Sequence, residues 1–253
     1  MYKFSEIVVK QKNYVQKMRK LAKDFIKTID KNQIDTILLS GSVSRGDYCP
    51  GKNGGAIDLI VMKNECSNIT VDEIFGKNEN PAIPYHCIKW NEQWFAILFI
   101  DFIDCNKFKE FNEPRKFSIM ESKILYDPDK RYTNELKNIK KYVKDELNNK
   151  LKSSLGYLKY IVGKEARWEI RKAYPHMHNN LNIAIELGIC CLYYLNGIYA
   201  PADDRKLYYT YELKKLPKNY ENLLVKLFEQ KIDSKKDYER RKKLFYEEFI
   251  GIF

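Results

Sequence analysis

The residues best suited to chemistry form a short turn of small side chains. A mostly apolar segment, residues 34–40, runs into Gly41 and Ser42, and Arg45 and Gly46 follow closely. Gly41 allows the backbone to approach a phosphate, while Ser42 and the N–H groups at a helix start can donate hydrogen bonds to phosphate oxygens. Arg45 can add charge-assisted hydrogen bonds. The turn is therefore a candidate phosphate-binding site, although a plain helix N-cap also explains Gly41 and Ser42.

An acid on the next expected strand extends this turn into a longer motif. Asp58 follows Ser42 by sixteen residues. The apolar strand, Gly-Ser, Arg-Gly and this acid together resemble the signature of the nucleotidyltransferase superfamily. The resemblance implies that Asp58 is catalytic and holds Mg²⁺, which bridges the phosphates of ATP or another nucleoside triphosphate. It also implies transfer of a nucleoside monophosphate, AMP above all, to a hydroxyl group of a small-molecule acceptor.

One acid of that signature is missing here. The family has two acids separated by one residue on this strand, whereas this chain has Asp58-Leu59-Ile60. The candidates to complete the metal site are Asp101, which could also be catalytic, and Asp104, with Asp47 as a further substitute. A strand-terminating role explains Asp101 equally well. Because Mg²⁺ keeps several waters and the triphosphate supplies oxygens, we expect nucleotide binding to survive better than catalysis.

Hydrophobic periodicity indicates an α+β fold that positions these residues. Apolar residues recur at helical spacing over residues 14–29 and again from residue 134 onward. Short apolar or β-branched segments predict strands at 34–40, 56–62, 83–90, 94–101 and around 124–126. We therefore expect an N-terminal mixed sheet with helices, a nucleotidyltransferase-type domain over residues 1–132. A C-terminal helical bundle over residues 133–253 would follow as the substrate and closure domain.

The helical half carries a second resemblance. Asn179, Ala184, Gly188 and the segment 194–201 look like the C-terminal domain of aminoglycoside- and lincosamide-type nucleotidyltransferases. In such enzymes this domain closes the cleft and can supply the base that deprotonates the acceptor.

Three polar positions in this half are candidates for contacts or packing. Glu186 lies on an otherwise apolar helix and is the candidate base or substrate contact, with a buried salt bridge as the alternative. Lys206 is a candidate phosphate or substrate contact, although a solvated turn is the favoured interpretation. His176 and His178 are expected to cap or pack rather than bind metal.

The chain is strongly basic, with a formal net charge of +11. Such a charge attracts polyanions without identifying one. The densest basic cluster, at residues 235–243, also contains Asp237 and Glu239, so it predicts a solvated helix face rather than a nucleic-acid patch. Nucleic acid is therefore a possible partner but not the favoured one.

The apolar stretches, the N-terminal residues and the cysteines bear on the cellular compartment. No stretch approaches the roughly 18 apolar residues that a bilayer crossing needs, and residues 1–6 lack the features of a secretion signal. Six cysteines without a C-x-x-C pair predict reduced thiols. We therefore expect a soluble, cytoplasmic protein with no membrane partner. Two further functions stay open: a nucleotide-binding protein that has lost catalysis, which Ile60 supports, and an RNA-directed nucleotidyltransferase toxin, which the charge supports.

Overall fold

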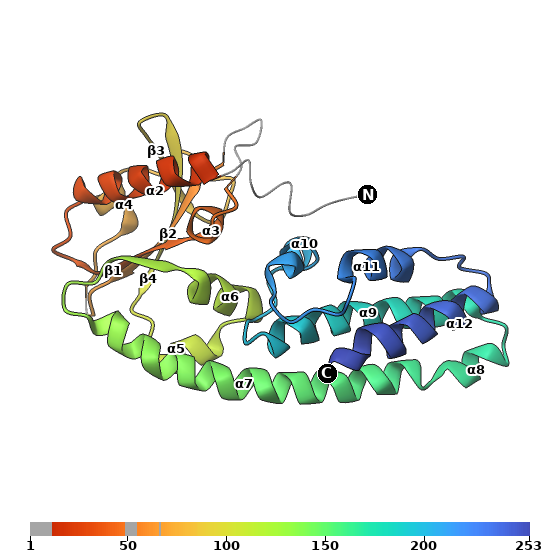
Figure 1. Cartoon of the computed structure of the whole chain (residues 1–253). Helices are drawn as coiled ribbons and strands as arrows, with labels where there is room; N and C mark the ends of the chain where they lie inside the picture. Colours follow the sequence, from red (N-terminus) through yellow and green to blue (C-terminus); the bar gives the residue numbers. More distant parts are fainter. Residues whose placement is uncertain (1–11, 49–54, 66) are drawn as a thin grey trace. The chain divides into compact units, whose positions relative to one another are not determined.

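The computed structural model describes residues 12–48, 55–65 and 67–253 (Figure 1). The chain divides into two compact units, Met1–Lys141 (unit 1) and Tyr142–Phe253 (unit 2). This division falls inside one long helix, α7 (Arg131–Val162). The sequence placed the boundary at residue 132, at the start of the same helix. Cys49, Cys66 and the N-terminal residues 1–6 lie outside the described residues. The four cysteines that the structure describes form no disulfide.

Unit 1 is built on a five-stranded mixed sheet, in the order β3-β4-β2-β1-β5. β2 and β4 run parallel, and the other neighbouring strands are antiparallel. The strands are β1 (Ile34–Ser40), β2 (Ile57–Lys63), β3 (His86–Trp90), β4 (Gln93–Asp101) and β5 (Lys123–Tyr126). The predicted α+β class is confirmed, and every predicted strand is present within three residues of its expected bounds.

Helix α2 (Lys12–Lys27) covers one face of this sheet (Figure 1). Its apolar residues, among them Met18, Ala22 and Phe25, share a core with every second residue of the strands. The strand residues of that core include Ile37, Leu39, Leu59, Phe95 and Ile97. Because side chains alternate along a strand, Leu38, Ser40, Asp58, Ile60 and Ala96 face the opposite side.

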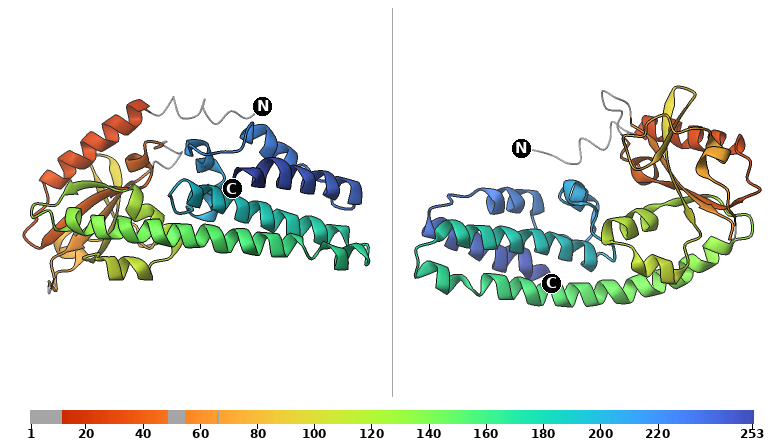
Figure 2. Two further views of the ribbon diagram at one scale, coloured as in Figure 1. Left: turned by 60° about the horizontal axis from the view of Figure 1, so that its bottom comes forward. Right: turned by 180° about the vertical axis from the view of Figure 1, so that it is seen from behind.

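Short helices complete unit 1, and the sequence analysis did not anticipate most of them. They are α3 (Gly41–Arg45), α4 (Val71–Phe75), α5 (Cys105–Glu110) and α6 (Glu113–Glu121). Helix α6 begins where the Asn112 side chain accepts a hydrogen bond from the Arg115 N–H at 3.0 Å, with Pro114 in the first turn. It lies on the side of the sheet opposite α2 (Figure 2). That side is where Asp58 points.

Unit 2 is helical throughout, as expected for its sequence. After α7 come α8 (Glu165–Glu169), α9 (Tyr174–Leu195), α10 (Asp203–Lys206), α11 (Tyr220–Phe228) and α12 (Lys235–Leu244), with short turns at Tyr208–Glu212, Phe245–Phe249 and Ile250–Ile252. Pro175 lies in the first turn of α9, where its missing N–H is tolerated, so it does not break that helix. In the described part of the chain, no helix has the length and apolar character needed to span a membrane.

A buried arginine connects three helices of unit 2. The Arg241 guanidinium on α12 is fully buried and donates to the Leu227 carbonyl at 2.7 Å, to His178 Nδ1 at 2.8 Å and to Gln230 Oε1 at 3.0 Å. It also donates to Asn182 Oδ1. His178 is itself buried, and its Nε2 lies 3.1 Å from the Ser234 carbonyl. The expectation that His178 packs is therefore confirmed, whereas the predicted solvated basic face is wrong at Arg241.

Candidate functional site at the Gly41 turn

The structure brings Gly41 and Asp58 into direct contact. β1 and β2 pair so that Ser40, the last residue of β1, lies opposite Asp58. Gly41 has a φ of +65°, which disfavours any residue with a side chain. A Cβ placed there would overlap Oδ2 of Asp58 and lie 2.8 Å from its Cγ. The turn therefore requires glycine for two reasons, and it holds the Asp58 carboxylate against the backbone.

Helix α3, which follows this turn, is anchored to α2 by Arg19. The guanidinium donates to the Val43 carbonyl at 2.9 Å and to the Ser44 carbonyl at 2.7 Å, so it occupies carbonyl groups at the helix C-terminus. Ser40 stands at the N-cap, but its hydroxyl lies 2.9 Å from the hydroxyl of Ser118 on α6 and does not cap. The N-cap is therefore Ser40, and the alternative that Gly41 and Ser42 form the cap is wrong.

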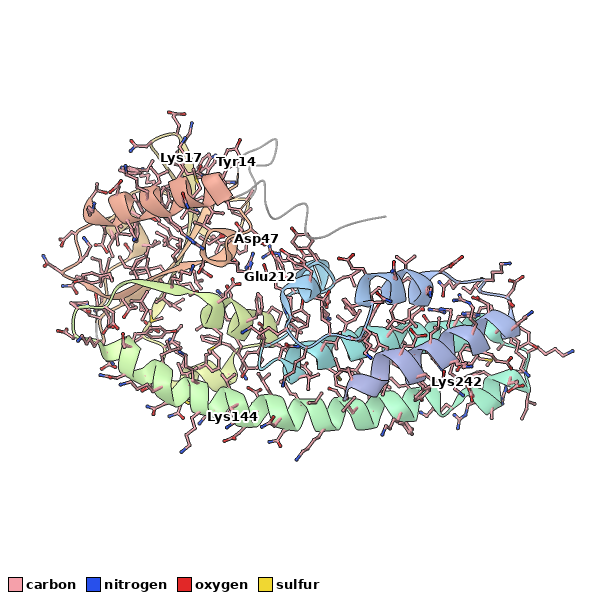
Figure 3. The ribbon with its side chains drawn as sticks, viewed as in Figure 1. Tyr14, Lys17, Asp47, Lys144, Glu212 and Lys242 are labelled. Carbon is pink, nitrogen blue, oxygen red and sulfur yellow. The ribbon has the colours of Figure 1, made fainter. Side chains whose placement is uncertain are left out.

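Two buried carboxylates hold the side chain of Arg45. Its Nη1 lies 2.6 Å from Oε1 of Glu121, and its Nε lies 3.3 Å from Oδ1 of Asp47, which Figure 3 labels beside α3. The side chains are 7%, 11% and 5% exposed for Arg45, Glu121 and Asp47, respectively. The expectation that Arg45 faces a phosphate is corrected, because its guanidinium is already engaged within the protein. Asp47 lies in an ion pair with Arg45, but its Oδ1 accepts no hydrogen bond from the residues that the structure describes.

Glu121 also accepts a hydrogen bond from the Gly41 N–H. Burial raises the pKa of this carboxyl to about 7, and the negative charge of Asp47 acts in the same direction. The hydrogen bonds from Arg45 and Gly41 lower the pKa but do not offset burial. Glu121 therefore gains its proton near neutral pH, at the centre of the contacts that hold α3.

This raised pKa predicts a pH-dependent loss of stability. In the unfolded chain Glu121 ionises near pH 4.5, but in the folded protein it ionises near pH 7. Its contribution to the free energy of unfolding is therefore full below pH 4.5 and falls by about 3 kcal/mol as the pH rises through 7. Glu121→Gln, which mimics the protonated acid, should match the wild type at pH 5 and be more stable by about that amount at pH 8. Urea unfolding at both values measures the difference.

Glu110, an exposed acid on neighbouring α5, gives the matched control. Glu110→Gln should shift stability by the same small amount at pH 5 and pH 8. An equal effect of Glu121→Gln at the two pH values would contradict the assignment of the proton to Glu121.

Asp58 is the one acidic residue among four that pair side by side across the sheet. The paired residues in that row are Ser40 on β1, Asp58 on β2, Ala96 on β4 and Cys87 on β3. Burial, with a smaller effect of Asp58, raises the pKa of the Cys87 thiol. One row further, Ile60 is 2% exposed and lies between Leu38 and Leu98. The position of the family's second acid is thus part of the hydrophobic core.

Asp101 lies at the other end of the sheet from Asp58. In the parallel pair Asp58 is opposite Ala96, whereas Asp101 is opposite Lys63 at the far end of β2. Asp101 pairs with Lys63 at 3.3 Å and with Lys107 at 3.2 Å. The hydrogen bond from Lys107 lowers the pKa of Asp101 most, and that from Lys63 lowers it further. By strand alternation it also belongs with Phe95 and Ile97, on the face opposite Asp58. The structure does not bring Asp101 to Asp58.

Asp104 has a structural role. It is the N-cap of α5, and its Oδ1 accepts a hydrogen bond from the Lys107 N–H at 2.7 Å. The expectation that Asp101 and Asp104 complete a metal site with Asp58 is therefore corrected. Asp101 is the last residue of β4 and Asp104 follows it, while Asp58 is near the N-terminal end of the parallel neighbour β2.

The carboxylates near the Gly41 turn determine which arrangement of metal ions the site can hold. Among the described residues, no group of three or more His, Cys, Asp or Glu side chains could hold a metal ion. Asp58 offers one carboxylate at the turn. This set fits a single Mg²⁺ that arrives with a triphosphate, because Mg²⁺ commonly takes one or two carboxylates together with phosphate oxygens and waters. It does not fit a two-ion site.

Comparison with known proteins adds one weak likeness. No protein-family model matches the chain, and no match is found among curated proteins. Among solved structures, the chain is similar to a nucleotidyltransferase-like protein from Exiguobacterium sibiricum 255-15. The identity is 12% and the TM-score is 0.31, with 94% of this chain and 73% of that chain covered. At this TM-score the likeness adds nothing to the geometry of the site.

The two candidates in unit 2 lie apart from the Gly41 turn in sequence and belong to a different unit. Glu186 is exposed on α9. The alternative that it forms a buried salt bridge is therefore wrong. Lys206 donates to Asp203 Oδ1 at 2.7 Å. Although burial lowers the pKa of Lys206, Asp203 and Cys190 raise it more. Lys206 is therefore a partly buried, paired cation rather than part of a solvated turn.

Two residues that position the turn escaped the sequence analysis. Glu121 and Arg19 lie far from Gly41 in the chain, and neither belongs to the motif. The start of α6 could have been found, because Asn112 followed by Pro114 is a helix N-terminal signal. The contact of its last residue with Gly41 depends on tertiary packing, which one sequence does not reveal.

Proposed function

We propose that the chain is a nucleotidyltransferase that binds a nucleoside triphosphate with Mg²⁺ at the Gly41 turn. It would move a nucleoside monophosphate, AMP from ATP, to a hydroxyl group of a small-molecule acceptor. The observation that supports this function is the position of the Asp58 carboxylate against Gly41. Asp58 supplies a hard oxygen ligand beside this glycine turn, and together with the half-buried Ser42 it is suited to a metal-bound phosphate group.

Each residue of the turn has a defined task in this proposal. Gly41 leaves room for Asp58 and for the approach of phosphate, and Ser42, which is half-buried, offers its hydroxyl to a phosphate oxygen. Asp58 would hold Mg²⁺, which when bound neutralises phosphate charge and polarises the reacting group. Arg45, Glu121 and Arg19 are positioning residues, because they fix α3 without facing the phosphates.

A second function is favoured by the single carboxylate. With Ile60 buried and Asp101 at the far end of the sheet, the chain would bind nucleotide without transferring it. The ligands supplied by the triphosphate itself are enough for binding, whereas the second ion of a two-ion mechanism has no carboxylate from this sheet row. The two functions share the nucleotide site and differ in the outcome of a transfer assay.

Calorimetric titration with MgATP tests the shared part. We expect the wild type to bind and Asp58→Asn to bind about 10- to 100-fold more weakly, because the substitution removes the charge that holds the ion. Asp101→Asn is the matched control, since it removes a strand carboxylate at the other end of the sheet. It should bind MgATP like the wild type. Equal binding by Asp58→Asn and the wild type would show that the metal assignment is wrong.

A transfer assay then separates the two functions. ATP labelled at the α-phosphate is incubated with the wild type and a panel of hydroxyl-bearing acceptors. Labelled product that disappears in Asp58→Asn supports nucleotidyl transfer. MgATP binding without product for any acceptor in the panel supports the binding protein.

A further inference from the structure

Unit 2 exposes an unusual pair of aromatic side chains near the end of α7. Tyr157 and Tyr160 are 57% and 58% exposed, and their rings stack with centroids 6.3 Å apart. The Lys164 ammonium lies 3.7 Å from the centroid of the Tyr160 ring. The Lys164 hydrogen bond and charge lower the pKa of Tyr160, with a smaller contribution from Arg167. Aromatic and cationic groups are therefore contiguous on this surface.

The same surface continues along α8, which follows α7 directly (Figure 1). The Arg171 guanidinium lies 5.7 Å from the centroid of the Trp168 ring and donates to the Arg167 carbonyl at 2.5 Å. We define the aromatic–basic face as Tyr157, Tyr160, Lys164, Arg167, Trp168 and Arg171. Two exposed tyrosines, three cations and the half-buried Trp168, whose ring centroid lies 3.9 Å from that of His176, thus follow one another over residues 157–171.

The acids near this face do not cancel its charge. Residues 147–164 contain no Asp or Glu. The Glu165 carboxylate is bonded to the Tyr238 hydroxyl and to Lys242, both on α12, and Figure 3 labels Lys242 there. Glu169 pairs with Lys235, also on α12. Both acids are thus neutralised by α12, while Lys164, Arg167 and Arg171 leave the face positive.

Gly156 is a second feature of this face that the fold does not require. It lies inside a 32-residue helix, where glycine is less favourable than alanine. A Cβ at this position would have nothing within 4 Å, so packing does not explain the glycine. Tyr160 is one turn further along the same side of the helix, and no atom of its ring lies within 4 Å of the position of the missing Cβ. The missing side chain therefore leaves open space on the helix surface one turn before Tyr160.

We infer that the aromatic–basic face binds single-stranded nucleic acid. Unpaired bases stack on exposed aromatic rings whatever their identity, and arginine and lysine side chains between the rings can hold the phosphates of the same strand. The open space at Gly156 gives a base room to lie against Tyr160. The inference concerns unit 2 alone and does not depend on nucleotide binding at Gly41.

The experiment uses the full chain and a fluorescently labelled uridine 12-mer, followed by anisotropy at several salt concentrations. The wild type should bind, and Tyr157→Ala/Tyr160→Ala should bind at least about tenfold more weakly, because stacking is lost. Arg167→Ala/Arg171→Ala should lower the dependence of log affinity on log salt by about 1.4, since each phosphate contact in a single strand contributes about 0.7. Asp58→Asn should bind the 12-mer like the wild type, which separates this test from the proposed function.

Matched variants control for exposure and folding. Tyr14→Ala removes an equally exposed tyrosine from unit 1, and Lys243→Ala removes an exposed lysine from α12. Neither should change affinity. Gly156→Ala should raise the thermal midpoint, because alanine favours helix, and yet weaken binding by filling the open space one turn before Tyr160.

Three results would overturn the inference. One is binding of the 12-mer that is unaffected by loss of both tyrosines, since this would be general attraction to a basic chain. Another is a Gly156→Ala variant that is more stable and binds as well as the wild type. The third is binding to vesicles of anionic lipid without binding to the 12-mer.

Discussion

Replacing Gly41 with alanine is expected to lower the free energy of unfolding by about 2–4 kcal/mol and to abolish MgATP binding. Alanine at a φ of +65° costs about 1 kcal/mol or more, and its Cβ would overlap the Asp58 carboxylate, so that either the strand end or Asp58 must move. Urea unfolding measures the first effect and calorimetric titration with MgATP the second. The loss of binding follows because displacement of Asp58 separates the carboxylate from the turn.

Gly197 provides the control for backbone strain alone. It has a φ of +73°, and a Cβ there would meet nothing within 4 Å. Gly197→Ala should therefore cost only the strain, about 1 kcal/mol, and leave MgATP binding intact. Combining Gly41→Ala with Asp58→Ala should recover part of the lost stability, because the overlap is relieved. If Gly41→Ala and Gly197→Ala destabilise equally, the contact between Gly41 and Asp58 has no energetic role.

Substitution of Arg241 with methionine is expected to destabilise the helical unit by about 3–5 kcal/mol. The change removes the donor of two buried acceptors, the Leu227 carbonyl and His178 Nδ1. It also removes a hydrogen bond from the half-buried Asn182 and one from the exposed Gln230. Burial lowers the pKa of Arg241, so the charge itself is costly, and methionine removes that cost. The lost hydrogen bonds outweigh this gain because the acceptors remain in place. Urea unfolding followed by far-UV circular dichroism measures the loss.

Arg240 is the adjacent control on the same helix. Its side chain is 39% exposed, pairs with Asp237 at 2.8 Å and donates to the Lys226 and Glu229 carbonyls at 3.1 and 2.9 Å. Because water can reach this side chain and replace its hydrogen bonds to the two carbonyls, Arg240→Met should cost about 1 kcal/mol. A similar loss for Arg240→Met and Arg241→Met would show that the buried hydrogen bonds of Arg241 do not stabilise the helical unit more than a surface pair.

Local sequence signals predicted most of the fold. β1 follows its expected bounds because residues 34–40 are mostly apolar and are followed by a glycine that adopts a positive φ. α9 begins at Tyr174 with Pro175 in its first turn, a position where proline is favoured. α5 and α6 were missed, because both are short and their caps, Asp104 and Asn112, resemble ordinary loop residues in sequence.

The candidate site was partly predictable. Gly41 and Asp58 meet because a turn and the strand that pairs with it are close in the chain. Asp101 was misplaced because a sequence gives no register: only the parallel pairing of β2 and β4 shows that the end of one strand lies far from the start of the other. Strand alternation did indicate that Asp101 shares a face with Phe95, but not that this face is the one packed against α2.

Charge was the least predictable property. The dense basic cluster at residues 235–243 drew attention in the sequence, yet Arg241 is buried, and Lys235 and Lys242 pair with Glu169 and Glu165. Those pairs neutralise the acids beside the aromatic–basic face. A run of cations in sequence is therefore compatible with ion pairs as well as with polyanion binding. Tertiary structure decides between the two.

Helix α7 makes the protein difficult to dissect. The division between the units, at Lys141 and Tyr142, falls inside this helix and not in a loop. A protease that cuts exposed loops would find no cleavage site there, and a fragment ending at the division would retain a severed helix whose remaining turns lack their continuation. Because helix formation is cooperative along the chain, fraying on one side of the division weakens the turns on the other. We therefore expect the two units to be produced and degraded together, as one chain.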